Sequence, residues 1–282
     1  NPVSQVSTPA NRGVSGDEPP MRSGTDRRNL LAVGRLSPQK GFDLLLEAFA
    51  CVAGHHANWD LTILGEGRSR AGLTATIVAR GLASRVSMPG FDSHVREAMR
   101  QADLFVLSSR FEGFPNVLLE AMSEGRACAS FDCNTGPREL ICHGENGWLV
   151  PAEDVPALAA ALDVLMGDDG LRARLGAHAR EVLTLYSLPA VLGQWNALLA
   201  SVTTSAGDIL FLIRSLARGG AERQLVALAA AMHRAGRDVA VACFYSGGAF
   251  QRELVEAGVP VIDLRKRGRW DVAGFLWRLF RA

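Results

Sequence analysis

The chain has 282 residues, enough for about two domains of ordinary size. Hydrophobic residues make up 48% and charged residues 21%, which excludes a disordered tail protein, a collagen-like fibre and a small disulfide scaffold. Lysine and arginine (30) almost balance aspartate and glutamate (29), so no global charge recruits nucleic acid or a membrane. The five cysteines are scattered and form no CxxC, which favours a reducing cytoplasm as the location.

The first part of the chain changes from a linker to an alternating pattern of strands and helices. Residues 1–28 are rich in polar residues, proline and glycine and show no hydrophobic period, which indicates a linker. Residues 29–200 then alternate short apolar strands with helices, which predicts a parallel sheet covered on both faces. The expected strands are 30–33, 61–64, 86–88, 104–107, 127–130 and 148–150. The expected helices are 40–53, a segment that follows the GEG at 65–67 and runs to about Arg80, 93–101, 116–124 and most of 153–200.

A second, smaller α/β unit follows a short linker at 201–207. Residues 208–282 repeat the strand–helix pattern of a second Rossmann-like unit. Its expected strands are 209–213, 239–242 and 259–262, with helices at 221–235 and 249–257 and a final amphipathic helix. We expect this unit to be the truncated first part of a domain.

The segment Glu112-Gly-Phe-Pro-Asn-Val-Leu-Leu-Glu120 follows the strand that ends at Leu107. Ligands bind beyond the carboxyl ends of strands in open parallel sheets. Pro115 suits a first helical position, which leaves Glu112 in the loop and places Glu120 inside the helix. Taken singly, each acid is better explained as a solvated charge than as a ligand-binding group. Gly113 allows a close backbone approach, and the amides of residues 116–118 offer an anion site.

The loop Gly34-Arg-Leu-Ser-Pro-Gln-Lys-Gly41 follows the first expected strand. Arg35 offers a forked donor and Lys40 a compact charge, a pair that suits a diphosphate. The loop matches neither the Walker A pattern nor GxGxxG, and by itself it fits an ordinary surface loop equally well. No metal site is expected, because the cysteines and histidine of residues 128–143 match no common zinc spacing.

Together these motifs resemble the donor domain of retaining GT-B glycosyltransferases of family 4. The resemblance rests on GRLSPQKGFD, the GEG at 65–67, the proline-glycine at 89–90, SSRFEGFPNVLLEAMSEG with its E-x7-E spacing, TGPREL, and HGENGWLVP at 143–151. It implies an α/β fold of the GT-B type and transfer of a sugar from a UDP- or GDP-linked donor to a glycan or lipid-linked acceptor. The family is usually metal-independent.

The resemblance also implies roles for particular residues. Arg35 and Lys40 would hold the diphosphate and stabilise the leaving group, and with Glu112 they are the expected catalytic residues. Glu112 would contact the donor sugar and Glu120 the ribose hydroxyls. The expected donor-binding set is Arg35, Lys40, Glu112, Gly113, Phe114, Asn116, Val117, Leu118 and Glu120, with Gly136, Pro137 and Glu139 in a loop near the sugar.

Residues 208–282 resemble the beginning of the acceptor domain of the same family. Gly219 and Gly220 mark its expected acceptor-side loop, although a tight turn explains the glycines too. Family members normally run acceptor domain first, so we interpret this order as a window from a tandem enzyme, with a circular permutant as the alternative. On this interpretation, nucleotide-sugar binding without efficient transfer is expected.

Two other functions and one surface remain as alternatives. A nucleotide-sugar-binding module without transfer activity and a UDP-sugar 2-epimerase-like enzyme share the architecture, although E-x7-E favours transfer. The C-terminal segment 265–281 is basic and carries Trp270, Trp277 and Phe280. It is a candidate for peripheral contact with a membrane, and packing into its own domain is the equal alternative.

Overall fold

The computed structural model describes residues 27–202, 209–217, 219–245 and 247–265. The chain divides into two compact units between Leu183 and Thr184. Each unit is described by itself. The basic segment 266–282 and its expected amphipathic helix lie outside the described residues.

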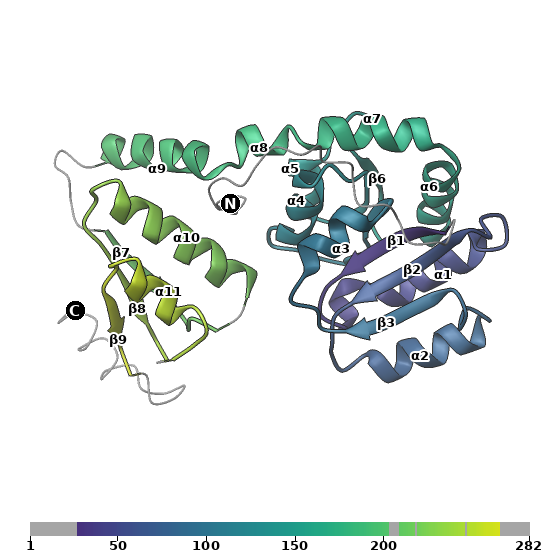
Figure 1. The fold of residues 1–282 in the computed structure, drawn as a ribbon, viewed down its shortest axis with the longest axis horizontal. Coiled ribbons are helices and arrows are strands. Elements are labelled where there is room, and N and C mark those ends of the chain that lie inside the picture. The colour runs from purple at the N-terminus through teal and green to yellow at the C-terminus, as the bar shows by residue number, and fades with distance from the viewer. Residues whose placement is uncertain (1–26, 203–208, 218, 246, 266–282) are drawn as a thin grey trace, which may run out of the picture. The chain divides into compact units, whose positions relative to one another are not determined.

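The first unit contains a six-stranded parallel sheet in the order β3-β2-β1-β4-β5-β6 (Figure 1). This is the strand order of a doubly wound Rossmann fold, which confirms the predicted fold class. The strands are β1 (Arg28–Val33), β2 (Trp59–Leu64), β3 (Val86–Gly90), β4 (Leu104–Leu107), β5 (Cys128–Asp132) and β6 (Trp148–Pro151).

Helices cover both faces of this sheet. Leu30 and Ala32 of β1 enter a core shared with α1 and α6, while Leu31 between them is buried toward the opposite face, as the pleat of a strand requires. On that face α3 and α4 contact β1 and β4. The helical elements of this unit are the single 3-10 turn η1 (Pro38–Lys40), α1 (Phe42–Val52), α2 (Arg70–Ala79), α3 (Val95–Gln101), α4 (Asn116–Ser123), α5 (Pro137–Leu140), α6 (Val155–Gly167), α7 (Asp169–Ala179) and α8 (Val182–Leu185).

Helix α1 shows why the sequence pattern predicted these elements. Its apolar residues recur at helical spacing, and every one of the five expected on its inner stripe is buried. These are Phe42, Leu45, Leu46, Phe49 and Val52.

The second unit contains the parallel sheet β7-β8-β9. Helix α9 (Leu188–Val202), which the sequence placed in the first domain, contacts α10 of this unit. The reason is that Val191 and Leu192 join the second hydrophobic core and the Trp195 ring packs edge-on against Phe211. The other elements are β7 (Ile209–Ile213), α10 (Gly220–Arg234), β8 (Val239–Cys243), α11 (Gln251–Glu256) and β9 (Val261–Asp263). In the part of the chain that the structure describes, no helix is long and apolar enough to cross a membrane.

Glycine is required where the loops after β1 and β2 approach each other. Gly65 adopts a φ of 143°, and a Cβ there would lie 1.9 Å from the carbonyl oxygen of Gly34. Only a residue without a side chain allows this approach. Gly41, with φ 60°, meets the same limit against the Ser108 carbonyl oxygen, at 2.0 Å.

An arginine ties three loops of the first unit together. Arg110 donates two hydrogen bonds to the Asp43 carboxylate, at 2.9 and 2.7 Å, and one to Glu153 at 2.9 Å. It also donates to the carbonyl oxygen of Pro38 at 2.7 Å. Because of the hydrogen bonds from Arg110, the pKa of the Asp43 carboxyl lies below its usual value.

Replacing Gly65 with alanine is expected to destabilise the protein by at least about 2 kcal/mol, because the methyl group meets backbone in a left-handed conformation. Gly72→Ala is the matched control. Gly72 is an exposed residue of α2 whose Cβ would meet nothing within 4 Å, so alanine there is expected to stabilise by about 0.5–1 kcal/mol. Chemical denaturation measures both, and equal stabilities would contradict the steric argument.

Replacing Arg110 with alanine is expected to lower the free energy of unfolding at pH 7 by about 1 kcal/mol, a value that allows for solvent screening of the half-exposed Asp43. A carboxyl group whose pKa is lower in the folded than in the unfolded protein stabilises the fold at pH values above its unfolded pKa, which is near 4. This stabilisation is lost as the pH falls through the folded pKa. The difference between wild type and variant should therefore narrow below about pH 4. Arg252→Ala, which removes an exposed pair within α11, should change stability by less than half as much.

Candidate functional site

The candidate site forms where the loops after β1, β2 and β4 meet, at the carboxyl edge of the first sheet. The Gly34 amide donates to the Leu64 carbonyl and the Leu36 amide to the Glu66 carbonyl, each at 2.9 Å. These bonds hold the loop 34–41 beside the GEG loop. The sequence predicted ligand contacts at this edge.

The loop after β1 is also joined to the loop after β4. The Ser108 hydroxyl donates to the Lys40 carbonyl at 2.9 Å, and the Arg110 amide donates to the Gln39 carbonyl at 2.8 Å. The two segments that carry the strongest sequence motifs are therefore neighbours in space, although some 70 residues separate them in the chain.

Two of the expected catalytic residues form an ion pair. Lys40 Nζ lies 2.5 Å from Glu112 Oε1, and the side chains are 17% and 8% exposed. The Ser109 hydroxyl donates to the same carboxylate at 2.6 Å. Removing charges from water is costly, and the mutual attraction and the added hydrogen bond offset part of that cost in this mostly buried position.

The loop after β5 holds the backbone of Glu112. The Thr135 hydroxyl donates to the Glu112 carbonyl oxygen. Gly136 adopts a φ of 95°, and a Cβ there would lie 2.4 Å from Pro115 Cδ. Burial and the Glu112 carboxylate together raise the pKa of the Cys133 thiol. The TGPREL segment, which the resemblance placed near the sugar, thus lies against the Glu112 loop.

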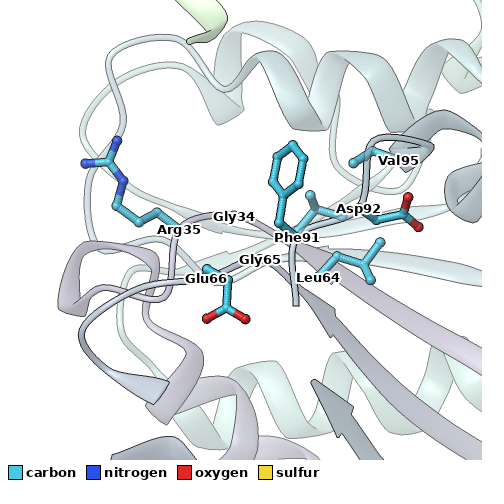
Figure 2. A pocket seen from close by; sticks show the side chains of 9 residues that line it. Gly34, Arg35, Leu64, Gly65, Glu66, Phe91, Asp92 and Val95 are labelled. Carbon is cyan, nitrogen blue, oxygen red and sulfur yellow. The ribbon is translucent and has the colours of Figure 1, made fainter. Parts of the chain in front are cut away.

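A pocket of about 350 Å³ opens beside the loop 34–41. Figure 2 shows the Phe91 ring above the backbone of Gly34 and Gly65, with the Arg35 side chain extending away from it. Arg35 is exposed and makes no hydrogen bond or ion pair within the described part of the chain. The residues that line the pocket are Val33, Gly34, Arg35, Leu64, Gly65, Glu66, Phe91, Asp92 and Val95.

Arg35 and Lys40 leave the loop in different environments. The stem of Lys40 passes Gly34 so closely that a Cβ on that glycine would lie 3.3 Å from three of its carbons. Lys40 thus forms its ion pair with Glu112 beside the wall of the pocket, whereas Arg35 is an exposed cation at the rim of the pocket.

Helix α4 begins at Asn116, as the expected range 116–124 predicted, but Pro115 precedes the helix as its N-cap and is not its first residue. The Asn116 amide donates to the Phe114 carbonyl and the Leu118 amide to the Pro115 carbonyl, each at 2.9 Å. Of the three amides expected to form an anion site, only that of Val117 has no hydrogen-bond partner among the described residues. Asn116 Oδ1 is buried without a partner there as well.

The remaining expected residues lie around this helix or in the second unit. Glu120 is half-buried in α4, Leu118 is buried and Phe114 half-buried. A Cβ on Gly113 would meet no atom within 4 Å, so packing within the protein does not require glycine there. Gly219 is the N-cap of α10 and Gly220 its first residue, in the second unit.

The sequence reasoning missed three contributors to this site. Ser109 and Thr135 hold Glu112, and Phe91 is the aromatic wall of the pocket. Phe91 had a usable signal, because it directly follows a strand of the parallel sheet. Ser109 and Thr135 act through hydrogen bonds that only the folded loops bring about. In the described ranges, no group of three or more His, Cys, Asp or Glu is arranged to hold a metal ion.

The chain is similar in sequence to known proteins over much of its length. The chain is 33% identical over 258 residues to an exopolysaccharide phosphotransferase of Streptomyces coelicolor, a match that covers 86% of this chain and 27% of the relative. It is 31% identical to the lipopolysaccharide core biosynthesis glycosyltransferase LpsE of Rhizobium meliloti, covering 69% of this chain and 56% of LpsE. The chain thus spans about a quarter to just over half the length of these relatives.

A solved structure superposes on about two thirds of this chain. A mutant of S. aureus TarM, crystallised with fondaparinux, alpha-GlcNAc-glycerol and UDP, superposes with a TM-score of 0.59 at 26% identity and covers 66% of this chain and 38% of TarM. This confirms the expected GT-B type of α/β architecture. The family model of glycosyl transferases group 1 matches residues 18–182. The chain therefore belongs to the glycosyl transferases group 1 family.

Proposed function

We propose that this protein transfers a sugar from a UDP- or GDP-linked donor to a glycan or lipid-linked acceptor, with retention of the anomeric configuration. The observation that carries the proposal is the convergence of Arg35, Lys40 and Glu112 at the carboxyl edge of one parallel sheet, beside a pocket. Two cations and one carboxylate suit cleavage of a sugar–diphosphate bond, because the cations can stabilise the leaving group and the carboxylate can orient the sugar.

The two cations suit the leaving group. Negative charge develops on the diphosphate as the sugar–phosphate bond breaks, and preorganised positive charge stabilises it. Arg35 is exposed and unpaired within the described residues, so it is available for a forked contact with phosphate oxygens. Lys40 adds a compact charge, and the Val117 amide at the start of α4 adds a backbone donor.

The two acids suit the neutral parts of the donor. Glu112 is held by Lys40 and Ser109 and would orient a hydroxyl of the donor sugar. Glu120, one turn into α4, would bind the ribose hydroxyls. Since retention implies attack from the leaving-group side in this family, Glu112 would orient the sugar and would form no covalent intermediate.

The pocket beside Arg35 suits the nucleobase. It lies at the ends of β1, β2 and β3, and the exposed Phe91 ring offers a face on which a base stacks. The base, the diphosphate and the sugar would then follow one another from this pocket past Gly34 to Glu112. The acceptor side is proposed from the relatives, whose names refer to exopolysaccharide and lipopolysaccharide core. Independence of a metal ion stays a prediction, and activity in EDTA tests it.

Replacing Arg35 with alanine is expected to weaken binding of UDP or GDP about tenfold, because a forked charged contact to phosphate is lost. Isothermal titration calorimetry with UDP, GDP, UDP-glucose, UDP-N-acetylglucosamine and GDP-mannose measures this and identifies the base. Arg174→Ala, an exposed arginine of α7, is the matched control and should bind as wild type does. Unchanged binding in Arg35→Ala would overturn the phosphate role.

Replacing Phe91 with alanine is expected to weaken UDP and UDP-sugar binding by the same factor, about five- to tenfold, because stacking on the base is lost from both. Phe111→Ala is the control, since Phe111 is 59% exposed, against 68% for Phe91, and lies outside the pocket lining. The same calorimetric titrations report the result. Equal losses in the two variants would show that the pocket does not hold the base.

A further inference from the structure

Both hydrogen-bond donors to the Glu112 side chain meet the same oxygen atom. Lys40 Nζ lies 2.5 Å from Oε1, and Ser109 Oγ donates to Oε1 at 2.6 Å. Within the described residues, no donor reaches Oε2. An ionised carboxylate has two acceptor oxygens, so one is saturated by the protein and the other keeps its full capacity to accept a hydrogen bond.

The two donors differ in how firmly they are placed. Ser109 is 1% exposed, and the residues on either side of it are tied to the loop after β1, Ser108 through its hydroxyl and Arg110 through its amide. A short side chain on a fixed backbone has little freedom. Lys40 reaches the carboxylate over a flexible four-carbon stem.

Lys40 also has a second proposed binding partner. In the proposed function its ammonium group binds the diphosphate, which competes with Glu112 for the same three protons. A carboxylate held only by Lys40 would turn when the diphosphate binds. The Ser109 hydroxyl has no such competing ligand, and it keeps Oε1 in place while the charge of Lys40 is shared.

We infer that Ser109 is a positioning residue that fixes the Glu112 carboxylate with Oε2 presented to the donor sugar. This inference rests on the proposed function, because the sugar is the group that Oε2 would receive. Ser109 itself touches neither substrate nor nucleotide. Its loss should therefore affect recognition of the sugar and leave recognition of the nucleotide unchanged.

The test compares two adjacent serines. Ser108 and Ser109 are each 1% exposed, but the Ser108 hydroxyl donates to the Lys40 backbone and the Ser109 hydroxyl to the Glu112 carboxylate. Calorimetry measures the affinity for UDP, UDP-glucose and UDP-N-acetylglucosamine, or for GDP and GDP-mannose if guanine is preferred. The affinity for the nucleotide-sugar divided by that for the nucleotide alone is the affinity gain from the sugar. Ser109→Ala should reduce this gain about tenfold with the nucleotide affinity unchanged, as for a lost hydrogen bond to a charged group. Ser108→Ala should leave the gain unchanged. A gain that survives in Ser109→Ala, or that falls equally in both variants, would overturn the inference.

A second measurement needs no donor. The free energies of unfolding of Ser109→Ala, Glu112→Ala and the double variant form a cycle. If the hydroxyl holds the carboxylate, the double variant loses less stability than the sum of the single variants. Additive losses would overturn the inference. If the cycle shows coupling but wild type binds no nucleotide, the proposed function fails while the contact between the two side chains stands.

Discussion

The ion pair between Lys40 and Glu112 is the interaction on which the candidate site depends. Two opposite charges lie 2.5 Å apart with little exposure to water, and neither would be tolerated there alone. Bringing them together requires the loops after β1 and β4 to touch, which in turn requires Gly41 to pass under the Ser108 carbonyl. The Rossmann-like sheet supplies the frame, because its parallel strands direct all of these loops to one edge.

Much of this frame was predictable from sequence, because burial imposes a regular period. The apolar run Leu104–Leu107 had the expected bounds, and the inner stripe of α1 is buried as its spacing required. The proximity of Arg35, Lys40 and Glu112 to one sheet edge followed from where their loops leave the strands. Periodic burial and strand polarity are local properties, which is why a single sequence reveals them.

What could not be predicted depends on the conformation of individual loops. The hydrogen bond of Ser109 exists only because the chain turns back three residues later to present Glu112 beside Lys40. The amides at the start of α4 were expected to be free, but two of them bond to the preceding turn. Gly113 faces open space within the protein, so a close approach of its backbone to a ligand stays a prediction. Such details are decided by the path of each loop, and no period in the sequence encodes it.

The membership of α9 in the second unit has a consequence for how the two parts are separated in the laboratory. The match to the Streptomyces relative covers 86% of this chain, more than either unit alone, so it includes at least part of both. A version of the second unit that starts at the linker after residue 202 would lack Val191 and Leu192, and the surface of α10 that they cover would face water. Exposed apolar surface of this kind promotes aggregation. A cut between α8 and α9, at Tyr186 or Ser187, lies close to the division of the chain and keeps α9 with the core it completes.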